Sequence, residues 1–267
     1  MRDGAILQCT EAITLGMPLE VWKTHMGRYR SLSTAESFTT IYRENGLGGF
    51  WKGSAPKMVE SATKGAVLVF AKDAIADGCA SAGIGKVPTG FIAGAGGGVC
   101  QTVVMGPCTF LVTATVTGGG DVGAMISKTW REKGVRGFYP GGSAIAFRQA
   151  TNWASRQGFT DAVRSRARLF FHNDPNAKLS TSQDALCGCL GGVLSSWNHP
   201  FEVARIEMQA RAVAGQPALS MVGVFREVVQ QYGVRGLFQG ILPRMGLSIW
   251  QTLFMVSGAT FIKDKLG

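Results

Sequence analysis

The segment from Trp197 to Arg211 reads WNHPFEVARIEMQAR. A helix over this segment would hold Pro200 in its interior, where the missing N–H and the ring clash bend the axis. Glu202, Arg205 and Gln209 follow at spacings of three and four, so their side chains share one face beyond the bend. Taken alone, the segment also fits a proline-started surface helix with an ordinary ion pair three residues apart. Recurrence of the pattern would decide between the two.

The proline segment recurs along the chain. Pro18, Pro107 and Pro200 lie 89 and 93 residues apart, each among apolar and small residues. A glycine, an aromatic residue and a second glycine follow each proline, at Gly46-Trp51-Gly53, Gly134-Tyr139-Gly141 and Gly233-Phe238-Gly240. The sequence therefore predicts three repeats of about ninety residues, which we place at residues 1–85, 86–178 and 179–267.

Each repeat reads as a long helix, a short amphipathic helix and a second long helix. In the first repeat, the first helix is expected to end near Arg28, the short one to start at the capping box of residues 33–36 and end near Gly46, and the last to span Gly53 to Cys79. The corresponding ranges are 88–117, 121–133 and 141–169 in the second repeat, and 182–212, 219–232 and 240–265 in the third. The sequence thus predicts six long and three short helices.

The composition favours a membrane protein over an ordinary soluble enzyme. The 267 residues are 46% hydrophobic and 16% charged and include 37 glycines, which is typical of closely packed membrane helices. A mean hydropathy of +0.14 is low for helices that face lipid on every side, but it fits a bundle around a polar cavity. The sequence therefore predicts an all-α membrane protein with six transmembrane helices around a central cavity.

Uncharged runs support three of the six spans. Residues 87–120 carry no charge, which exceeds the roughly 20 residues that a bilayer requires, and the runs Ala185 to Phe201 and Met245 to Ile262 are near that minimum. The fourth long helix instead carries charged residues along it, among them Arg148, Arg156, Asp161 and Arg164. Charges on a spanning helix are tolerable only toward a polar cavity or the protein interior, so they are candidates for function.

The net charge of +10 indicates an anionic partner: nucleic acid, an anionic lipid surface or a small polyanion.

The six cysteines include no CxxC pair and are interpreted as packing residues. The three histidines have no metal-ligand or triad spacing, so no metal, cofactor or catalytic site is expected. Glu11 interrupts the apolar run of the amino terminus, so we expect neither a secretory signal nor a cleaved transit peptide.

The composite motif Pro-x-Glu-x-x-Lys/Arg followed by Gly-x4-aromatic-x-Gly resembles the signature of the mitochondrial carrier family across essentially the whole chain. The first copy supplies Pro18, Glu20 and Lys23, and the third supplies Pro200, Glu202 and Arg205. The resemblance implies a transporter and not an enzyme, with several spans of the mitochondrial inner membrane. It also implies short helices on the matrix side, contact with membrane lipid such as cardiolipin, and a functional monomer.

In the family, the acid of each repeat pairs with the base of the next to form a gate on the matrix side. The second repeat departs from this pattern, because Thr109 and Val112 replace its acid and base. The resemblance therefore predicts a weak matrix gate made by Glu20, Lys23, Glu202 and Arg205, with Gln209 as its brace. Glu202 and Lys23 would be its one full ion pair, while Glu20 would face Val112 and Arg205 would face Thr109. Glu202 and Arg205 are thus interpreted as two half-pairs that reach to neighbouring helices.

A looser resemblance predicts a second gate on the cytoplasmic side. Asp161 and Arg164 match the family's acid and base on the fourth helix, Asp73 supplies an acid on the second, and Lys263 supplies a base on the sixth. The expected pairs are Asp73 with Arg164 and Asp161 with Lys263.

Four stretches are similar to fungal members of the family that carry citrate and oxoglutarate. They lie at residues 60–67, 148–153, 196–209 and 243–256. The resemblance implies an antiporter that exchanges citrate for 2-oxoglutarate, with another di- or tricarboxylate or oxoacid as an alternative. The family's contact points would then be Glu60, Lys64, Arg148, Gln149 and Arg244.

The residue chemistry agrees with an anion site. Arg148 and Arg244 offer planar forks for carboxylates, Lys64 offers an ammonium, and Gln149 can donate to a keto or hydroxyl oxygen. We hypothesise that Glu60 pairs with Lys64 when the smaller anion is bound. Structural interpretations remain for each: an intrahelical Glu60–Lys64 pair, a capping role for Arg244, and a packing role for Arg148.

Nucleic-acid binding is the competing function, prompted by the net charge and by the cluster Arg164, Arg166 and Arg168. A mitochondrial DNA-binding protein of the same fold is therefore a second hypothesis. These arginines would equally fit a loop-proximal surface that faces lipid headgroups.

Overall fold

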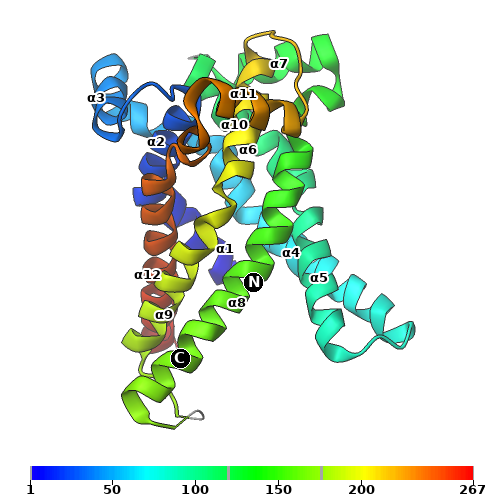
Figure 1. Ribbon diagram of the computed structural model, residues 1–267, viewed down its shortest axis with the longest axis vertical. Coiled ribbons are helices and arrows are strands. Elements are labelled where there is room, and N and C mark those ends of the chain that lie inside the picture. Colours follow the sequence, from blue (N-terminus) through cyan, green and yellow to red (C-terminus); the bar gives the residue numbers. More distant parts are fainter. Residues whose placement is uncertain (1, 119–120, 175–176, 267) are drawn as a thin grey trace.

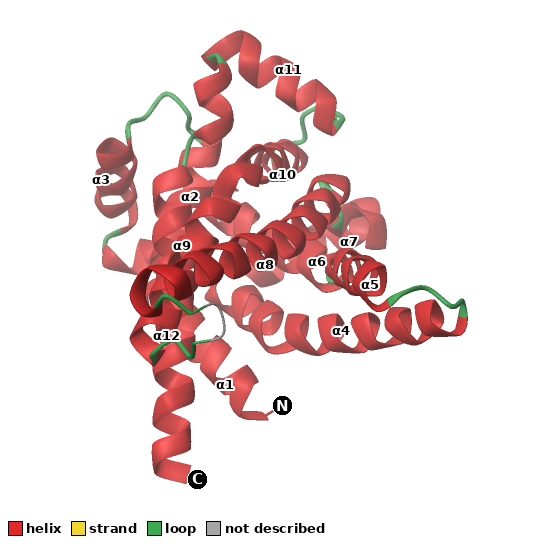
Figure 2. Ribbon diagram, turned by 60° about the horizontal axis from the view of Figure 1, so that its bottom comes forward, coloured by secondary structure: helices red, strands yellow, loops and turns green. Residues whose placement is uncertain are grey.

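The computed structural model describes residues 2–118, 121–174 and 177–266, and in these ranges every regular element is a helix (Figure 1, Figure 2). The first repeat contains α1 (Arg2–Glu11), the π-turn η1 (Ala12–Gly16), α2 (Met17–Arg28), α3 (Thr34–Asn45), the 3₁₀ turn η2 (Leu47–Trp51) and α4 (Ser54–Ser81). The second contains α5 (Lys86–Cys100), α6 (Thr102–Gly118), α7 (Val122–Lys133), η3 (Val135–Phe138) and α8 (Gly142–His172). The third contains α9 (Thr181–Leu194), η4 (Ser195–Asn198), α10 (His199–Val213), α11 (Met221–Tyr232), η5 (Val234–Phe238) and α12 (Ile241–Leu266). The predicted order of long, short and long helices is therefore confirmed in all three copies.

The first long helix of every repeat is broken near its proline. Pro18 and Pro200 each occupy the second position of a new helix, after the turns η1 and η4. Pro107 instead lies inside α6, and the axis bends by 45° at Gln101, between Ile92–Cys100 and Thr102–Gly118. We expected each proline to mark a kink inside a helix. The helices do bend near all three prolines, but each break precedes its proline. The reason is that proline disturbs the carbonyl four residues before it, so the deformation falls in the preceding turn.

The signature aromatic residues of the first two repeats contact these breaks. The Tyr139 hydroxyl donates to the carbonyl oxygen of Val103 at 2.9 Å, and Val103 is the residue whose helical donor Pro107 removes. In the first repeat, the Trp51 Nε1 donates to the carbonyl of Ile13 at 2.5 Å. In these two repeats the aromatic residue of the signature thus satisfies a backbone carbonyl near the break, whereas Phe238 of the third repeat has no polar hydrogen to donate.

The short helices α3, α7 and α11 are capped at both ends. The Ser33 N–H donates to Glu36 at 2.8 Å in the predicted capping box, and this bond lowers the pKa of the Glu36 carboxyl. Asp121 and Ser220 cap the other two helices. At their carboxyl ends, Gly46, Gly134 and Gly233 adopt positive φ, which ends a helix at little cost only for glycine.

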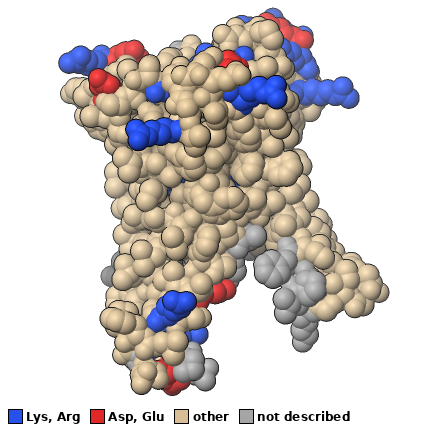
Figure 3. Space-filling model, viewed as in Figure 1, with Lys and Arg blue, Asp and Glu red and all other residues tan. Residues whose placement is uncertain are grey.

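The long helices form a ring. Contacts run from α4 to α5, α5 to α8, α8 to α9, α9 to α12, and α12 back to α1 and α2, and α1 also contacts α4. The bent halves α2, α6 and α10 contact one another in all three pairings, which closes the ring at the end where the short helices lie, at the top of Figure 1. At the other end the α4–α5 and α8–α9 pairs spread apart, and Figure 3 shows a hollow between them. We call these the closed end and the open end.

The second glycine of each signature allows a close approach between repeats. Gly53, Gly141 and Gly240 adopt φ of 80°, 74° and 87° directly before α4, α8 and α12. A Cβ on Gly240 would lie 3.1 Å from the carbonyl oxygen of Lys23, one on Gly141 would lie 3.3 Å from that of Arg205, and one on Gly53 would lie 3.1 Å from the Val112 Cα. Each glycine therefore packs against the base position of the next repeat's motif, which sets the register of the ring.

The apolar core lies under the short helices at the closed end. Ile41 and Phe50 pack against Val21 of α2, while Val224 and Val228 of α11 pack against Ala204 of α10. The third cluster consists of Phe110, Leu111 and Phe138. These contacts fix α2, α6 and α10 and hence the polar residues that they carry.

By length and composition, no single helix of the described ranges is sufficient to cross a membrane. One bent pair is, namely Ile92–Cys100 with Thr102–Gly118. This pair falls in the longest uncharged run of the sequence.

Candidate functional site

The charged residues of the proline motifs lie where α2, α6 and α10 cross. Glu20 and Lys23 come from α2, and Glu202 and Arg205 from α10, and each of the four exposes 5% or less of its surface. Ion pairs this deep require close partners, because a buried unpaired charge is costly.

Glu202 and Lys23 make the contact between repeats that the sequence predicted. The Lys23 Nζ lies 2.7 Å from Glu202 Oε1. The same ammonium lies 2.8 Å from Glu20 Oε1, so Lys23 joins two carboxylates from different repeats.

The interpretation of Glu202 and Arg205 as half-pairs without local contact was wrong. Arg205 binds Glu202 of its own helix through two nitrogens, with Nη2 at 2.8 Å and Nε at 3.2 Å. Its distance to Glu20 is 3.9 Å. Because Thr109 offers no carboxylate, the acid one turn earlier on the same buried face becomes the main partner of Arg205.

Gln209, one turn after Arg205 on α10, holds the Arg205 side chain against Glu202. Its Oε1 accepts from Arg205 Nη1 at 2.8 Å and from the Thr113 hydroxyl at 2.8 Å, and its Nε2 donates to Thr109 Oγ1 at 3.0 Å. Thr109, which holds the acid position of the second repeat, therefore binds Gln209 in place of a charged residue.

The sequence predicted that Glu20 would face Val112 and lack a cation from the second repeat. In the structure, Glu20 also has a cation of its own repeat nearby. Val112 is buried beside Gly53, and Lys57 of α4 approaches Glu20 Oε2 to 3.8 Å. The Lys57 Nζ also lies 3.1 Å from Glu60 Oε1. Lys57 thus supplies a cation that Val112 cannot, and it connects the proline motif with a predicted substrate residue.

Arg148 makes a similar connection on the other side. Its Nε lies 3.0 Å from Glu202 Oε2, and 15% of its side chain is exposed. The predicted substrate residue Arg148 therefore contacts an ion pair of the proline motifs directly, and Glu60 is connected to one through Lys57. We call the following set of buried or nearly buried residues the central cluster: Glu20, Lys23, Lys57, Glu60, Arg148, Glu202, Arg205 and Arg244.

Lys64 remains outside these pairs. Glu60 binds Lys57 rather than Lys64 here. The hypothesised Glu60–Lys64 pair belongs to the carrier with the smaller anion bound and stays a prediction. In the part of the chain that the structure describes, no carboxylate oxygen lies within 4.0 Å of the Lys64 ammonium. Its cation is thus available to a ligand.

The amide N–H of Gln149, which was predicted to donate to the substrate, is used in a hydrogen bond to another side chain. Its Nε2 donates to Gln101 Oε1 at 2.8 Å, and the Trp153 Nε1 donates to the same oxygen at 3.0 Å. Gln101 in turn donates to the Lys64 carbonyl at 2.8 Å. Gln149 therefore joins α8 to the bend between α5 and α6, and through it to α4.

Arg244 lies at the start of α12 and is 7% exposed. It donates to Asn198 Oδ1 and contacts His199 Nδ1 at 3.4 Å, both on the third repeat's break. Its partners are neutral, so its charge is left for an anion.

Of the two predicted cytoplasmic pairs, Asp73 with Arg164 is not present, and Asp161 with Lys263 stays a prediction. Asp73 is exposed, and Arg164 binds Asp184 of α9 through two contacts of 2.6 and 2.9 Å and reaches Asp161 at 3.6 Å. The Lys263 side chain lies outside the described residues. The expectation of an Asp73–Arg164 pair failed because the helices diverge at the open end, where α9 is the neighbour of α8 and α4 is not.

A second group of ion pairs lies beyond the central cluster, toward the short helices. Glu207 is 5% exposed and contacts three arginines: Arg28 Nη1 at 3.0 Å, Arg30 Nη2 at 3.0 Å and Arg211 Nε at 2.9 Å. Arg211 also pairs with Glu227 of α11. We call Arg28, Arg30, Glu207, Arg211 and Glu227 the Glu207 group, and it links the first and third repeats.

The sequence missed Lys57 and Glu207 as candidates. Lys57 carried a usable signal, because it follows Gly53 by four residues just as Arg244 follows Gly240. Glu207 carried only the local signal of Arg211 four residues further on, since its other partners Arg28 and Arg30 are distant in the sequence and follow no repeat pattern.

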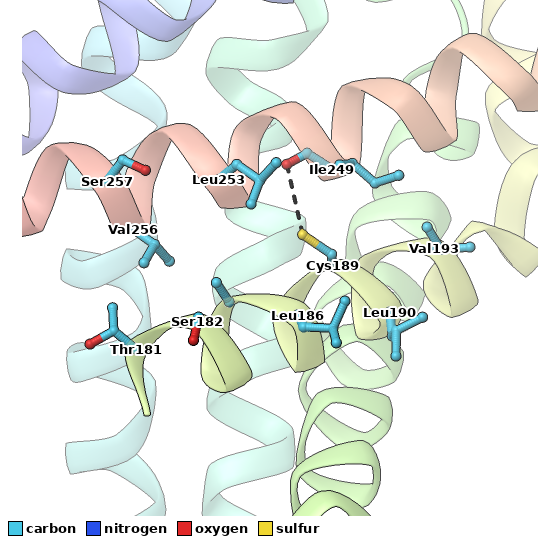
Figure 4. A pocket seen from close by; sticks show the side chains of 11 residues that line it. Thr181, Ser182, Leu186, Cys189, Leu190, Val193, Ile249, Leu253, Val256 and Ser257 are labelled. Atoms are coloured by element: carbon cyan, nitrogen blue, oxygen red, sulfur yellow. Dashed lines mark hydrogen bonds between the residues drawn. The ribbon is translucent and has the colours of Figure 1, made fainter. Parts of the chain in front are cut away.

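An apolar groove lies elsewhere, between α9 and α12 (Figure 4). Leu186, Leu190 and Leu253 line it, and the Cys189 thiol lies 4.0 Å from the Ile249 carbonyl oxygen. Such apolar walls suit hydrocarbon better than a carboxylate, so they do not offer an anion site. All six cysteines are free, as expected of packing residues, and the described residues contain no group of three or more potential metal ligands.

Comparison with known proteins agrees with this architecture. The model of the mitochondrial carrier protein family matches residues 4–80, 85–169 and 177–267. The chain is 36% identical to the citrate/oxoglutarate carrier protein of Saccharomyces cerevisiae, over 98% of this chain and 88% of that protein. It is 28% identical to an adenine nucleotide transporter of Arabidopsis thaliana, over 86% and 60%, and 23% identical to the tricarboxylate transport protein of Saccharomyces cerevisiae, over 91% and 87%. The chain therefore belongs to the mitochondrial carrier family, whose members are transporters and not enzymes.

Proposed function

We propose that the chain is an antiporter of the mitochondrial inner membrane that exchanges citrate for 2-oxoglutarate. One central anion site would be reached alternately from the two sides of the membrane. The name of the relative at 36% identity supports this choice of substrates, and another di- or tricarboxylate or oxoacid is the alternative.

The observation that carries the proposal is the charge of the central cluster. It contains five cations and three carboxylates, an excess of two positive charges next to the closed end. Lys64 and the buried Glu11 add one charge of each sign and leave this excess unchanged. A dianion such as 2-oxoglutarate would neutralise it, and guanidinium groups bind carboxylates well.

In this proposal Arg148, Arg244 and Lys64 bind the carboxylates. Glu60 and Lys57 set the charge on the opposite wall, and Gln149 holds α8 in place through Gln101. The ion pairs of Glu20, Lys23, Glu202 and Arg205, braced by Gln209, form the matrix gate. Asp73, Asp161, Arg164 and Lys263 remain proposed members of a cytoplasmic gate that assembles when the open end closes.

The membrane arrangement is part of the proposal. The six long helices, broken ones included, would cross the bilayer, with repeats at residues 1–85, 86–178 and 179–267 and with the closed end toward the matrix. Figure 3 supports this, because the face shown carries Lys, Arg, Asp and Glu at its two ends and none across the band between them. Exposed apolar side chains such as Val69, Phe70 and Leu190 suit contact with lipid. No observation favours nucleic-acid binding, since Arg164 of the basic cluster is paired with Asp184.

Exchange by purified protein in liposomes tests the proposal. Liposomes loaded with 2-oxoglutarate should take up labelled citrate, and empty liposomes should not. Arg148→Gln should reduce the exchange rate at least tenfold, because the site loses a charge-assisted carboxylate contact. Arg226→Gln, on the exposed face of α11, should leave the rate unchanged. Uptake of a different solute, with neither carboxylate exchanged, would contradict the substrates.

A further inference from the structure

Glu202 is the carboxylate on which the three repeats converge. Lys23 of the first repeat lies 2.7 Å away, Arg148 of the second 3.0 Å and Arg205 of the third 2.8 Å. Two of these cations belong to the proline motifs, whereas Arg148 belongs to the proposed substrate site. One oxygen, Oε2, thus connects the gate directly with the site.

The contact of Arg148 with Glu202 is held by charge more than by directed bonds. Its Nε is 3.0 Å from the carboxylate, but this buried N–H makes no hydrogen bond. Among the described residues, the Arg148 side chain donates no hydrogen bond at all. A guanidinium binds a carboxylate best through two parallel N–H donors, so a ligand carboxylate can bind Arg148 better than Glu202 does here.

The repeat pattern explains why a site residue completes the gate. The second repeat has Thr109 and Val112 where the others have an acid and a base, so it contributes no charge through α6. The cations are supplied instead from the second long helix of a repeat, by Lys57 on α4 and Arg148 on α8. Position 247 of α12, equivalent to Arg148 when counted from the signature glycine, is Leu247 and supplies none.

We propose that the transported anion and Glu202 compete for the guanidinium of Arg148, so that anion binding removes one ion pair from the matrix gate. The inference rests on the proposed function and adds how filling the site is coupled to opening. The empty carrier keeps Arg148 on Glu202 and stays closed at the matrix end. The loaded carrier has Arg148 on the substrate carboxylate, and Glu202 retains only Lys23 and Arg205. Because coupling is reciprocal, a stronger Glu202–Arg148 contact weakens anion binding by the same factor.

Two carboxylate variants separate this competition from general effects of charge. Glu202→Gln and Glu20→Gln each remove one buried negative charge and one gate acid, but only Glu202 contacts Arg148. The dissociation constants of 2-oxoglutarate and citrate are measured on purified protein by calorimetry. We expect Glu202→Gln to bind either anion about tenfold more tightly than Glu20→Gln, the factor expected for one charged contact. In an Arg148→Gln background, Glu202→Gln should no longer strengthen binding beyond Glu20→Gln.

The outcomes are distinguishable. Equal dissociation constants for the two variants, with wild-type protein binding both anions, would overturn this inference and leave the proposed function standing. Wild-type protein that binds neither anion would overturn both. If circular dichroism shows that Glu202→Gln does not fold, Glu202→Asp replaces it, since the shorter acid keeps its charge but withdraws from Arg148. Binding by Glu202→Asp no tighter than wild type would then count against the competition.

Discussion

At the scale of single residues, Tyr139 shows how the family signature serves the broken helix. Pro107 has no N–H for the Val103 carbonyl, and the Tyr139 hydroxyl supplies a donor at 2.9 Å. The sequence showed the proline and the aromatic residue as two separate motifs. Their contact joins α6 to the end of η3 and accounts for a polar aromatic residue at that position.

Replacing Tyr139 with Phe should therefore destabilise the protein by about 1 kcal/mol, the usual value of one hydrogen bond. The thermal unfolding midpoint of purified protein in detergent measures the loss. In a Pro107→Ala background the restored N–H can bond to Val103, so Tyr139→Phe should cost clearly less. The same loss in both backgrounds would show that the hydroxyl does not act through this carbonyl.

At the scale of helices, the Glu207 group joins α2 and its following loop to α10 and α11. One buried carboxylate serves Arg28, Arg30 and Arg211, which come from two repeats. This link lies on the side of the central cluster nearer the short helices, so in the proposed orientation it adds a second layer to the matrix gate. The Glu207 group thus adds ion pairs to a gate in which the second repeat contributes no charge through α6.

Glu207→Gln should lower the free energy of unfolding by about 2–3 kcal/mol, between the values for exposed and fully buried ion pairs. Glu227→Gln is the matched control, because Glu227 is 33% exposed at its side chain and contacts only Arg211 of this group. We expect it to cost less than 1 kcal/mol. Thermal unfolding of the two variants compares them directly, and equal losses would argue against a special role for Glu207.

At the scale of the whole molecule, the ring is threefold in backbone but not in charge. The signature glycines pack in the same way against all three base positions, yet those positions hold Lys23, Val112 and Arg205. The bundle therefore closes symmetrically, while its ion pairs concentrate between the first and third repeats. The second repeat contributes Arg148 instead, which belongs to the substrate site.

Restoring the missing charges should strengthen the gate and slow exchange. The double variant Thr109→Asp with Val112→Lys would place an acid near Arg205 and a base near Glu20, at backbone positions that already accept long side chains in the other repeats. We expect citrate/2-oxoglutarate exchange in liposomes to be about three- to tenfold slower, equivalent to roughly 1 kcal/mol of added closed-state stability. The control is Thr109→Asn with Val112→Met, which has similar volume without charge. A charged variant as fast as this control would contradict a weak gate as the basis of turnover.

The sequence by itself determined the three repeats, the order and approximate ends of their helices, the capping box at Ser33 and the contact of Glu202 with Lys23. The repeats, the helices and the capping box follow from local spacing and from the repeat period. The Glu202–Lys23 contact follows from the resemblance to the carrier family, in which the acid of one repeat pairs with the base of the next. Only the tertiary structure decided that Arg205 turns to its own helix, that Arg148 and Lys57 enter the gate, and that Glu207 gathers three arginines. The physical reason is that a buried charge takes the nearest opposite charge in three dimensions, and that neighbour depends on where helices bend and cross rather than on their order in the chain.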